Sequence, residues 1–372
     1  MHILQHPQEI LDQSTIEKIR GQVAKATHDR HLTQEQLKLI YEQQWLRLFI
    51  PKRYQGLEMD LPQALQILEA LAYADGSLGW TVNLGAGANL FAAYIRPSLS
   101  EQVFTNPKAC IAGSGAMGGS ARPEEEGYRV RGQWKYGSGS AHATVFTANC
   151  KLPHNGKASD LPNFHSFVFF PDEVDVKNTW DSYGLQATSS HDFEVKEQWL
   201  PEERTFSLLK PSPYEDGPLY RFPFMQFGEV TTCLQLTGMA LHFQDEVRGL
   251  LLQKKGMMGE SLKENIKVQD TLAQAEASLE SARTWLYVLV QEAWQQCEAG
   301  DAPSEEILRK ISLAVKHAAQ AARESAEKVY PLAGMTVLSP DTDLNRCWRD
   351  LHTASQHVLL SPLDFAGQMK AY

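Results

Sequence analysis

The sequence predicts a mainly α-helical protein with a central β domain. Residues 1–107 carry helix start signals and apolar side chains at helical spacing, and the same pattern returns from residue 213 to residue 372. Between them, residues 108–212 contain short apolar stretches separated by turns that are rich in glycine and proline. We therefore expect three domains in the order helical, β and helical.

In the N-terminal domain, local signals mark the starts of individual helices. Thr33 precedes Gln36 by three residues, which is the spacing of a capping box. Pro62 follows shortly after Asp60, and proline favours the first turn of a helix. Residues 80–94 are rich in small side chains and predict a largely buried helix. On this helix, Trp80 either packs against neighbouring helices or lines a pocket.

Five short strands are predicted in the middle domain, and Gly118-Gly119 is expected to lie in one of the turns between them. Such strands fit either a small β-barrel or a packed pair of sheets. The predicted strands are Ala109–Gly113, Tyr128–Arg131, Thr144–Cys150, Ser166–Phe170 and Asp192–Gln198.

A run of four small residues, Gly137-Ser138-Gly139-Ser140, ends the stretch that contains the second strand. Because this run has almost no side-chain bulk, a flat ligand could lie directly against its backbone. Ser138 is then a candidate ligand contact. The alternative is a serine in an ordinary tight turn.

Four long helices are expected in the C-terminal domain, from the helical spacing of their apolar residues. The first starts at about Phe224, and the second spans Gln269–Cys297. Ser304 opens the third, which the segment Pro331 to Gly334 is expected to break. The last spans Arg346–Leu359.

Composition and spacing exclude several classes of function. The net charge of −10 argues against nucleic acid or an anionic membrane surface as the main partner. No apolar run reaches the roughly 18 to 20 residues of a membrane span. The five cysteines lie far apart and show neither disulfide nor metal-ligand spacing, which favours a cytoplasmic location. No HxxxH pair suggests a metal site, and no GxGxxG motif suggests direct NAD(P)H binding.

Five segments then occur in a recognisable order. They are FIPKRYQGLEMDL (49–61), LAYADGSLGW (71–80), GYRVRGQWKYGSGSAHA (127–143), WDSYGLQATSSHDFEVKEQWLPEERT (180–205) and CWRDLHTASQHVLLSP (347–362). In this order they resemble the acyl-CoA dehydrogenase superfamily over nearly the whole chain. The resemblance implies a middle β-barrel domain, a C-terminal four-helix bundle and a homotetramer. It also implies a flavin between the β domain and the bundle.

The last segment favours one branch of that superfamily. Acyl-CoA dehydrogenases usually carry a catalytic glutamate near the position of Val358, and here that position is apolar and adjacent to His357. The pattern WRDLHTASQH looks like the flavin-dependent monooxygenase branch. Those enzymes receive reduced flavin from a separate reductase and form a C4a-hydroperoxide on it with O2. The resemblance therefore implies the oxygenase component of a two-component monooxygenase that acts on a small molecule, expected to be aromatic.

The resemblance implies catalytic roles for Ser138 and His357. Ser138 would face flavin N5, whose N–H a hydroxyl can accept as a hydrogen bond. His357 would lie beside the flavin on the last helix, where an imidazole can steady the peroxide or take a proton from a phenol. The alternative for His357 is a structural role. His352 lies five residues earlier and would point about 140° away around the helix, so the two histidines are not a metal pair.

The remaining site residues also follow from the resemblance. Lys255 aligns with an arginine that reaches the FAD of a neighbouring subunit in many dehydrogenases, and lysine lacks the bidentate fork of arginine. This change, with Ala333 to Thr336 in place of a glycine-rich loop, favours FMN over FAD as the cofactor. The other expected flavin contacts are Ser114, Gly115, Trp134 and Gly139, and the expected substrate pocket residues are Trp80, Asn83, Tyr183 and Phe224.

Two alternative functions remain open at the level of sequence. The first is an FAD-dependent acyl-CoA dehydrogenase whose base lies on the first bundle helix, where Glu229 is about two residues from the expected position. The second is a non-catalytic member of the superfamily that has lost flavin.

Overall fold

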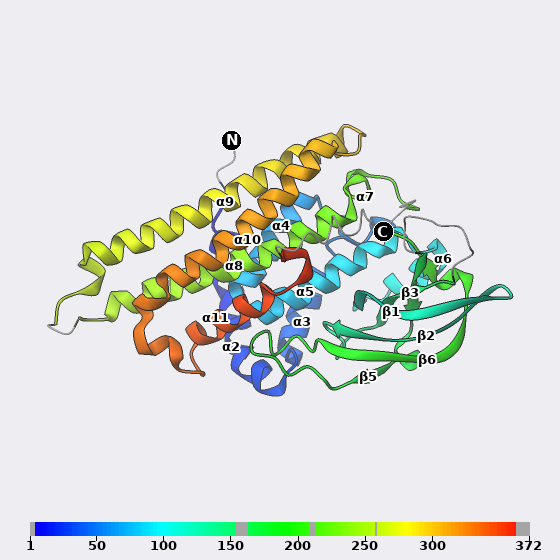
Figure 1. Cartoon of the computed structure of the whole chain (residues 1–372), viewed down its shortest axis with the longest axis horizontal. Helices are drawn as coiled ribbons and strands as arrows, with labels where there is room; N and C mark the ends of the chain where they lie inside the picture. The colour runs from blue at the N-terminus through cyan, green and yellow to red at the C-terminus, as the bar shows by residue number, and fades with distance from the viewer. Residues whose placement is uncertain (1–3, 154–162, 209–212, 257–258, 362–372) are drawn as a thin grey trace.

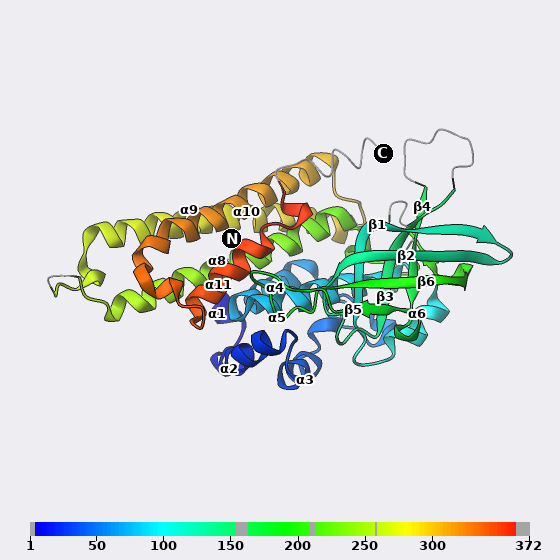
Figure 2. The ribbon, with the colours of Figure 1, turned by 60° about the horizontal axis from the view of Figure 1, so that its bottom comes forward.

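The computed structural model of the protein describes residues 4–153, 163–208, 213–256 and 259–361. Figure 1 shows an elongated molecule, with the ends of long helices at the left and the sheet at the right. The N-terminal helices are α1 (Pro7–Ile10), α2 (Gln13–Asp29), α3 (Gln34–Glu42), α4 (Leu61–Ala74), α5 (Gly76–Asn89) and α6 (Pro97–Phe104). In Figure 2, α4 and α5 lie between the bundle and the helices α2 and α3.

Local signals explain the start of most helices. The predicted capping box of α3 is confirmed, because Thr33 and Gln36 exchange side-chain and backbone hydrogen bonds. Asp75 separates α4 from α5, and its carboxylate accepts the N–H of Leu78 at 2.8 Å. A Cβ on Gly79 would lie 2.5 Å from the Cα of Ala72, so glycine lets α5 pack directly against α4.

The β domain is one mixed sheet with the strand order β5-β6-β2-β1-β3-β4-β7. β1 and β3 pair parallel, and the other neighbours pair antiparallel. The sheet curls, because Phe193 on β6 contacts Phe146 on β3 at 5.3 Å between ring centroids although their strands are not neighbours. The strands are β1 (Ile111–Glu124), β2 (Gly127–Gly137), β3 (Val145–Lys151), β4 (Phe164–Phe169), β5 (Asp175–Lys177), β6 (His191–Pro201) and β7 (Thr205–Phe206).

The prediction that Gly118-Gly119 forms a turn is wrong. Both glycines lie inside β1, which is much longer than the predicted strand at 109–113. A Cβ on Gly119 would lie 2.3 Å from Cζ2 of Trp134, so the two glycines make room for the indole ring. The glycines therefore serve packing in the β core rather than a change of chain direction.

The C-terminal domain is built from the long helices α8, α9 and α10, which pack along one another, and from α11 (Figure 1). Ser304 caps α10 as predicted, and α10 ends at Ala333, within the segment that was expected to break it, although the helix includes Pro331. The last helix differs from the prediction, because α11 ends at Ala354 and not near Leu359. These helices are α7 (Pro218–Arg221), α8 (Phe224–Gln253), α9 (Ile266–Glu298), α10 (Glu305–Ala333) and α11 (Asp343–Ala354).

The fold is mainly α with a central β domain, as expected. The predicted domain boundaries after residues 107 and 212 stay predictions, and residue 212 lies outside the described residues. None of the helices in the described part of the chain is long and apolar enough to cross a membrane. Within the same residues, no group of three or more acidic, histidine or cysteine side chains could hold a metal ion. All five cysteines are buried and free.

Candidate functional site

The small-residue run forms a turn after β2 and packs against the segment 185–190, which leads into β6. The N–H of Gly139 donates to the carbonyl oxygen of Thr188 at 2.8 Å. Gly139 has a φ of +78°, and a Cβ there would lie 3.4 Å from the ring of His142. Ser138 is buried, and its Oγ lies 2.7 Å from Oγ of Ser190. The turn thus combines glycine backbone without side-chain bulk with the two buried hydroxyls of Ser138 and Ser140.

His357 lies just beyond the end of α11, in extended backbone that caps a short 3-10 turn, Val358–Leu360. The angular argument that separated His352 from His357 on one helix is therefore wrong, because the helix ends between them. Nδ1 of His357 accepts the N–H of Leu359 at 3.4 Å, which leaves the proton of the neutral ring on Nε2. Burial lowers the pKa of His357 to about 4. At pH 7 this ring is a hydrogen-bond donor and a weak base.

One helix, α5, touches both His357 and the small-residue run. The Trp80 ring meets His357 edge-on, with 5.5 Å between ring centroids and 71° between the ring planes. Cγ2 of the adjacent Thr81 lies 3.6 Å from the position that a Cβ on Gly139 would take. These contacts bring three segments together that lie far apart in the sequence: residues 80–81, 138–139 and 357.

Asn83 lies one helical turn after Trp80 on α5 and is 1% exposed. Neither its amide oxygen nor its amide nitrogen has a hydrogen-bond partner in the described part of the protein. A buried amide with both groups unpaired is unfavourable by a few kcal/mol unless a ligand or water satisfies it. Asn83 is therefore the best-supported of the predicted substrate contacts.

His142 was not among the predicted site residues. Its Nε2 is buried without a partner among the described residues, and the ring lies directly against Gly139. Burial lowers its pKa to about 4, and the electrostatic interaction with the nearby His31 adds to this. A histidine two residues after the small-residue run was the available signal, but the sequence alone did not show that its ring turns back under that run.

Other predicted residues lie apart from this cluster. Phe224 packs at the start of α8 in an aromatic group with Phe91 and Phe227. Tyr183 is 60% exposed, and its carbonyl oxygen accepts a hydrogen bond from Arg349 at 2.9 Å. Within one chain, Tyr183 therefore lies at the surface and does not line a buried pocket.

The expected flavin contacts on β1 and β2 differ from one another. Trp134 is 1% exposed, stacks on Phe193 and donates its indole N–H to the carbonyl oxygen of Asn149 at 3.0 Å. Its ring belongs to the β core, so the prediction of a cofactor contact through that ring is not supported. Ser114 and Gly115 lie at an irregularity in the pairing of β1 with β3 and are accessible, so both stay candidates.

Lys255 lies between α8 and α9, on the loop at the end of the bundle away from the sheet (Figure 1). It is exposed and pairs through its backbone with Ser261. Within one chain, Lys255 cannot therefore contact a ligand at the small-residue run. A phosphate contact from this residue requires a second copy of the chain.

A buried carboxylate ties α11 to the segment 185–190. Oδ1 of Asp350 accepts the N–H of Leu185 at 2.6 Å. A Cβ on Gly76 would lie 2.9 Å from Oδ2 of Asp350, so the start of α5 presses against the same group. Burial raises the pKa of Asp350 to about 7, and repulsion from the buried Asp75 adds to this.

This carboxylate predicts a pH-dependent stability. The native pKa lies above the unfolded value, so the contribution of Asp350 to stability is full below about pH 4 and is lost as the pH rises toward about 7. We expect Asp350→Asn, which keeps an acceptor for Leu185, to gain up to about 4 kcal/mol relative to the wild type between pH 4 and pH 8. Urea unfolding at both pH values measures this difference. The exposed Asp341→Asn is the control, and an equal pH dependence of the wild type and Asp350→Asn contradicts the assignment.

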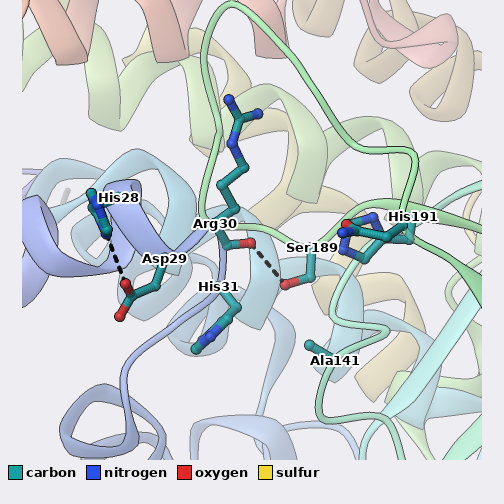
Figure 3. Close-up of a pocket in the computed structure, with 8 residues that line it drawn as sticks. His28, Asp29, Arg30, His31, Ala141, Ser189 and His191 are labelled. Atoms are coloured by element: carbon teal, nitrogen blue, oxygen red, sulfur yellow. Dashed lines mark hydrogen bonds and ion pairs between the residues drawn. The ribbon is translucent and has the colours of Figure 1, made fainter.

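A separate cavity of about 400 Å³ lies where the end of α2 meets the segment before β6 (Figure 3). Its charged groups already have partners: His28 pairs with Asp29 at 2.9 Å, and Arg30 pairs with Asp181 at 2.6 Å. Ser189 donates to the carbonyl oxygen of Arg30 at 3.2 Å, as the dashed line in Figure 3 shows. The cavity therefore belongs to a polar contact region between α2 and the segment before β6, and it is not a site with unpaired charges.

Comparison with known proteins decides the family. A family model of the acyl-CoA dehydrogenase N-terminal domain matches residues 8–102, and one of the acyl-CoA dehydrogenase C-terminal domain matches residues 230–362. The chain belongs to the acyl-CoA dehydrogenase superfamily. Within this superfamily, it resembles indole-3-acetate monooxygenase from Pseudomonas putida at 29% identity, over 94% of the chain and 90% of the relative. It also resembles the oxygenase subunit HsaA of a flavin-dependent monooxygenase from Mycobacterium tuberculosis at 25% identity, over 91% and 88%.

Solved structures of the superfamily share the fold. A 3-HSA hydroxylase from Rhodococcus sp. RHA1 superimposes with a TM-score of 0.87 at 23% identity, over 96% of this chain and 94% of that one. XiaF from Streptomyces sp., solved with FADH2 and glycerol, gives a TM-score of 0.85 at 22% identity, over 95% and 92%. The curated relatives are named monooxygenases, which places the chain in the flavin-dependent monooxygenase branch of the acyl-CoA dehydrogenase superfamily.

The geometry does not support Glu229 as the catalytic base that a dehydrogenase of this superfamily would need. Glu229 is buried on α8 and accepts a hydrogen bond from Ser312 of α10 at 2.5 Å, so it points into the bundle. The neighbouring Gly228 faces the 3-10 turn after His357, since a Cβ on it would lie 3.2 Å from Leu359. No carboxylate occupies position 358, which is valine.

Proposed function

We propose that the protein is the oxygenase component of a two-component flavin-dependent monooxygenase. It takes reduced flavin from a separate reductase and uses O2 to oxygenate a small aromatic molecule. The observation that carries the proposal is the convergence on α5: Trp80 contacts His357, and Thr81 borders the bare turn that holds Ser138. A flat ligand against that turn would meet a hydroxyl on one side and an imidazole N–H on another.

The residues at this turn fit a reduced flavin. Gly139 has no side chain and a φ of +78°, and the Ser138 hydroxyl would accept the N–H that reduced flavin carries at N5. When bound, a reduced flavin would supply the two electrons that activate O2 for transfer of one oxygen atom to the substrate. The chain's own part is to hold N5–H at Ser138, to exclude water with Trp80 and to offer an N–H from His357.

An aromatic substrate is supported by the side chains around α5. On α5, Trp80 contributes an aromatic ring beside His357, and Asn83 adds one buried amide without a partner among the described residues. A planar molecule with one polar substituent matches this combination. The relatives' names point the same way, since they include an indole-3-acetate monooxygenase and a p-hydroxyphenylacetate 3-hydroxylase.

We further propose a cytoplasmic homotetramer that prefers FMN. Lys255 lies in the connection between α8 and α9, at the end of the bundle away from the sheet (Figure 1), so its ammonium group would meet a flavin phosphate only in an assembly of several copies. Lysine offers a phosphate a point charge without the bidentate fork of the arginine found in FAD-binding relatives, which favours FMN. Five free cysteines, all buried, suit a reducing compartment.

Rapid mixing tests the proposal. The protein with reduced FMN, mixed with oxygenated buffer, is expected to give a transient flavin absorbance that decays far more slowly than the reoxidation of free reduced flavin. Acyl-CoA thioesters are expected to leave bound oxidised flavin unbleached. Reoxidation at the rate of free flavin, or bleaching by a thioester, contradicts the proposal.

The protonation state of His357 gives a second prediction. Because its pKa is lowered to about 4, His357 stays neutral from pH 5.5 to pH 8.5. The pH profile of product formation over that range should therefore show no rise or fall near pH 6.5 that depends on this residue. We expect His357→Ala to lower the product yield per reduced flavin by about tenfold and His357→Gln, which keeps an N–H donor, to lower it less. A rise or fall near pH 6.5 that disappears in His357→Gln contradicts this role.

A further inference from the structure

Three buried hydroxyl groups form a chain that ends at Ser138. Oγ of Ser138 lies 2.7 Å from Oγ of Ser190, and Oγ of Ser190 lies 2.7 Å from Oγ1 of Thr188. Oγ1 of Thr188 lies 2.9 Å from the carbonyl oxygen of Leu185. The three hydroxyl residues are 6%, 3% and 1% exposed, so bulk water does not compete for these hydrogen bonds.

The hydrogen bonds between these three hydroxyl groups can run in only one donor-to-acceptor direction. A carbonyl oxygen carries no proton, so Thr188 must donate its single hydroxyl proton to Leu185. Because this proton is already donated, the Thr188 hydroxyl can only accept a hydrogen bond from Ser190. Ser190 then has no proton left for Ser138, so Ser138 must donate to Ser190. The hydroxyl of Ser138 consequently faces any ligand with lone pairs alone.

The backbone around the chain holds it in place. The carbonyl oxygen of Thr188 accepts the N–H of Gly139 at 2.8 Å, and Thr188 also forms a β-bridge with His31 at the end of α2. Between Thr188 and Ser190, the side chain of Ser189 donates to the carbonyl oxygen of Arg30 (Figure 3). The hydroxyls are thus fixed by both the N-terminal domain and the small-residue run.

We propose that Thr188 and Ser190 are positioning residues that make Ser138 an obligate hydrogen-bond acceptor, so that the site selects reduced over oxidised flavin. This inference rests on the proposed function. Reduced flavin carries an N–H at N5, which an acceptor binds. Oxidised flavin presents a lone pair at N5, which an acceptor repels. Selection for the reduced form is what an enzyme supplied by a separate reductase requires.

Anaerobic titration of the protein with reduced and with oxidised FMN tests the positioning role of Thr188 and Ser190. The measured quantity is the ratio of the oxidised to the reduced Kd. Thr188→Val keeps the β-branched shape but has no hydroxyl, which frees the proton of Ser190 for Ser138. We expect its oxidised-to-reduced Kd ratio to fall about tenfold from the wild-type value. For a two-electron couple this equals a midpoint potential of bound flavin about 30 mV lower. In Ser190→Ala we expect the Kd ratio to fall by a similar factor. In Thr188→Ser, which keeps the hydroxyl, we expect the ratio to stay within about twofold of the wild-type value.

The outcomes separate this positioning role from the proposed function. Suppose that the wild type prefers reduced FMN and that the Kd ratio drops in Ser138→Ala but not in Thr188→Val or Ser190→Ala. This result contradicts the positioning role of Thr188 and Ser190 and leaves the proposed function standing. A wild-type protein with no preference for reduced FMN contradicts both. Circular dichroism and thermal unfolding of each variant check that it is folded, and Thr188→Ser checks that the effect follows the hydroxyl and not the substitution.

Discussion

Glu69→Ala is expected to lower the free energy of unfolding by about 3–5 kcal/mol, the largest effect of any single change considered. Glu69 on α4 and Arg283 on α9 are 1% and 2% exposed, and their side chains meet through two hydrogen bonds of 2.7 and 2.8 Å. Thr237 on α8 and Tyr287 on α9 donate to the same carboxylate. Removing Glu69 leaves the buried guanidinium of Arg283 without its main partner.

Urea unfolding of a small set of variants measures this effect. Glu280 also pairs with Arg283 but is about one-third exposed, so Glu280→Ala is the matched control and is expected to cost less than about 1 kcal/mol. The double variant Glu69→Leu with Arg283→Met removes both buried charges, and it is expected to recover most of the lost stability. A cost for Glu69→Ala no larger than that for Glu280→Ala contradicts the account of this ion pair.

Ser138→Ala is expected to have the largest effect on flavin handling among the changes at the site. The variant loses the acceptor for N5–H, and we expect reduced FMN to bind about tenfold more weakly, the net worth of one hydrogen bond. The yield of oxygenated product per reduced flavin should fall with it, and hydrogen peroxide should rise. Anaerobic titration and a peroxide assay measure the two quantities.

Ser140→Ala is the matched control for that change. Ser140 belongs to the same turn, but its hydroxyl donates to the carbonyl oxygen of Ser189 at 2.6 Å and takes no part in the hydroxyl chain. We expect this variant to bind reduced FMN within about threefold of the wild type. Equal weakening in both variants would mean that the turn as a whole, and not the Ser138 hydroxyl, holds the flavin.

Signals that are local in the sequence predicted their elements well. The capping box at Thr33 and the cap at Ser304 depend on residues three positions apart, and the structure contains both. Each of the five predicted strands has a counterpart in the sheet, although β1 is much longer than expected. The sequence also indicated a bare turn at Gly139, because glycine and serine are small wherever they lie.

Features that depend on distant segments were not predictable in this way. Gly118-Gly119 looked like a turn because the indole of Trp134, which fills the space beside these glycines, comes from another strand. The last helix ends at Ala354, before His357, and the short turn that follows packs against Gly228 of α8, which is distant in the sequence. Ser138 and Ser190 are 52 residues apart, and Glu69 and Arg283 are 214 apart, so no sequence spacing joins them.

Incorporation of oxygen from ¹⁸O2 tests the central claim most directly. The protein, reduced FMN supplied by a flavin reductase, and a panel of phenols and indoles are incubated under ¹⁸O2, and the products are analysed by mass spectrometry. We predict that at least one aromatic compound gains a single ¹⁸O atom only when protein, reduced flavin and O2 are all present, and that Ser138→Ala lowers the yield. Products that carry oxygen from water, or product formation that is unchanged without the protein, would contradict the assignment as a monooxygenase.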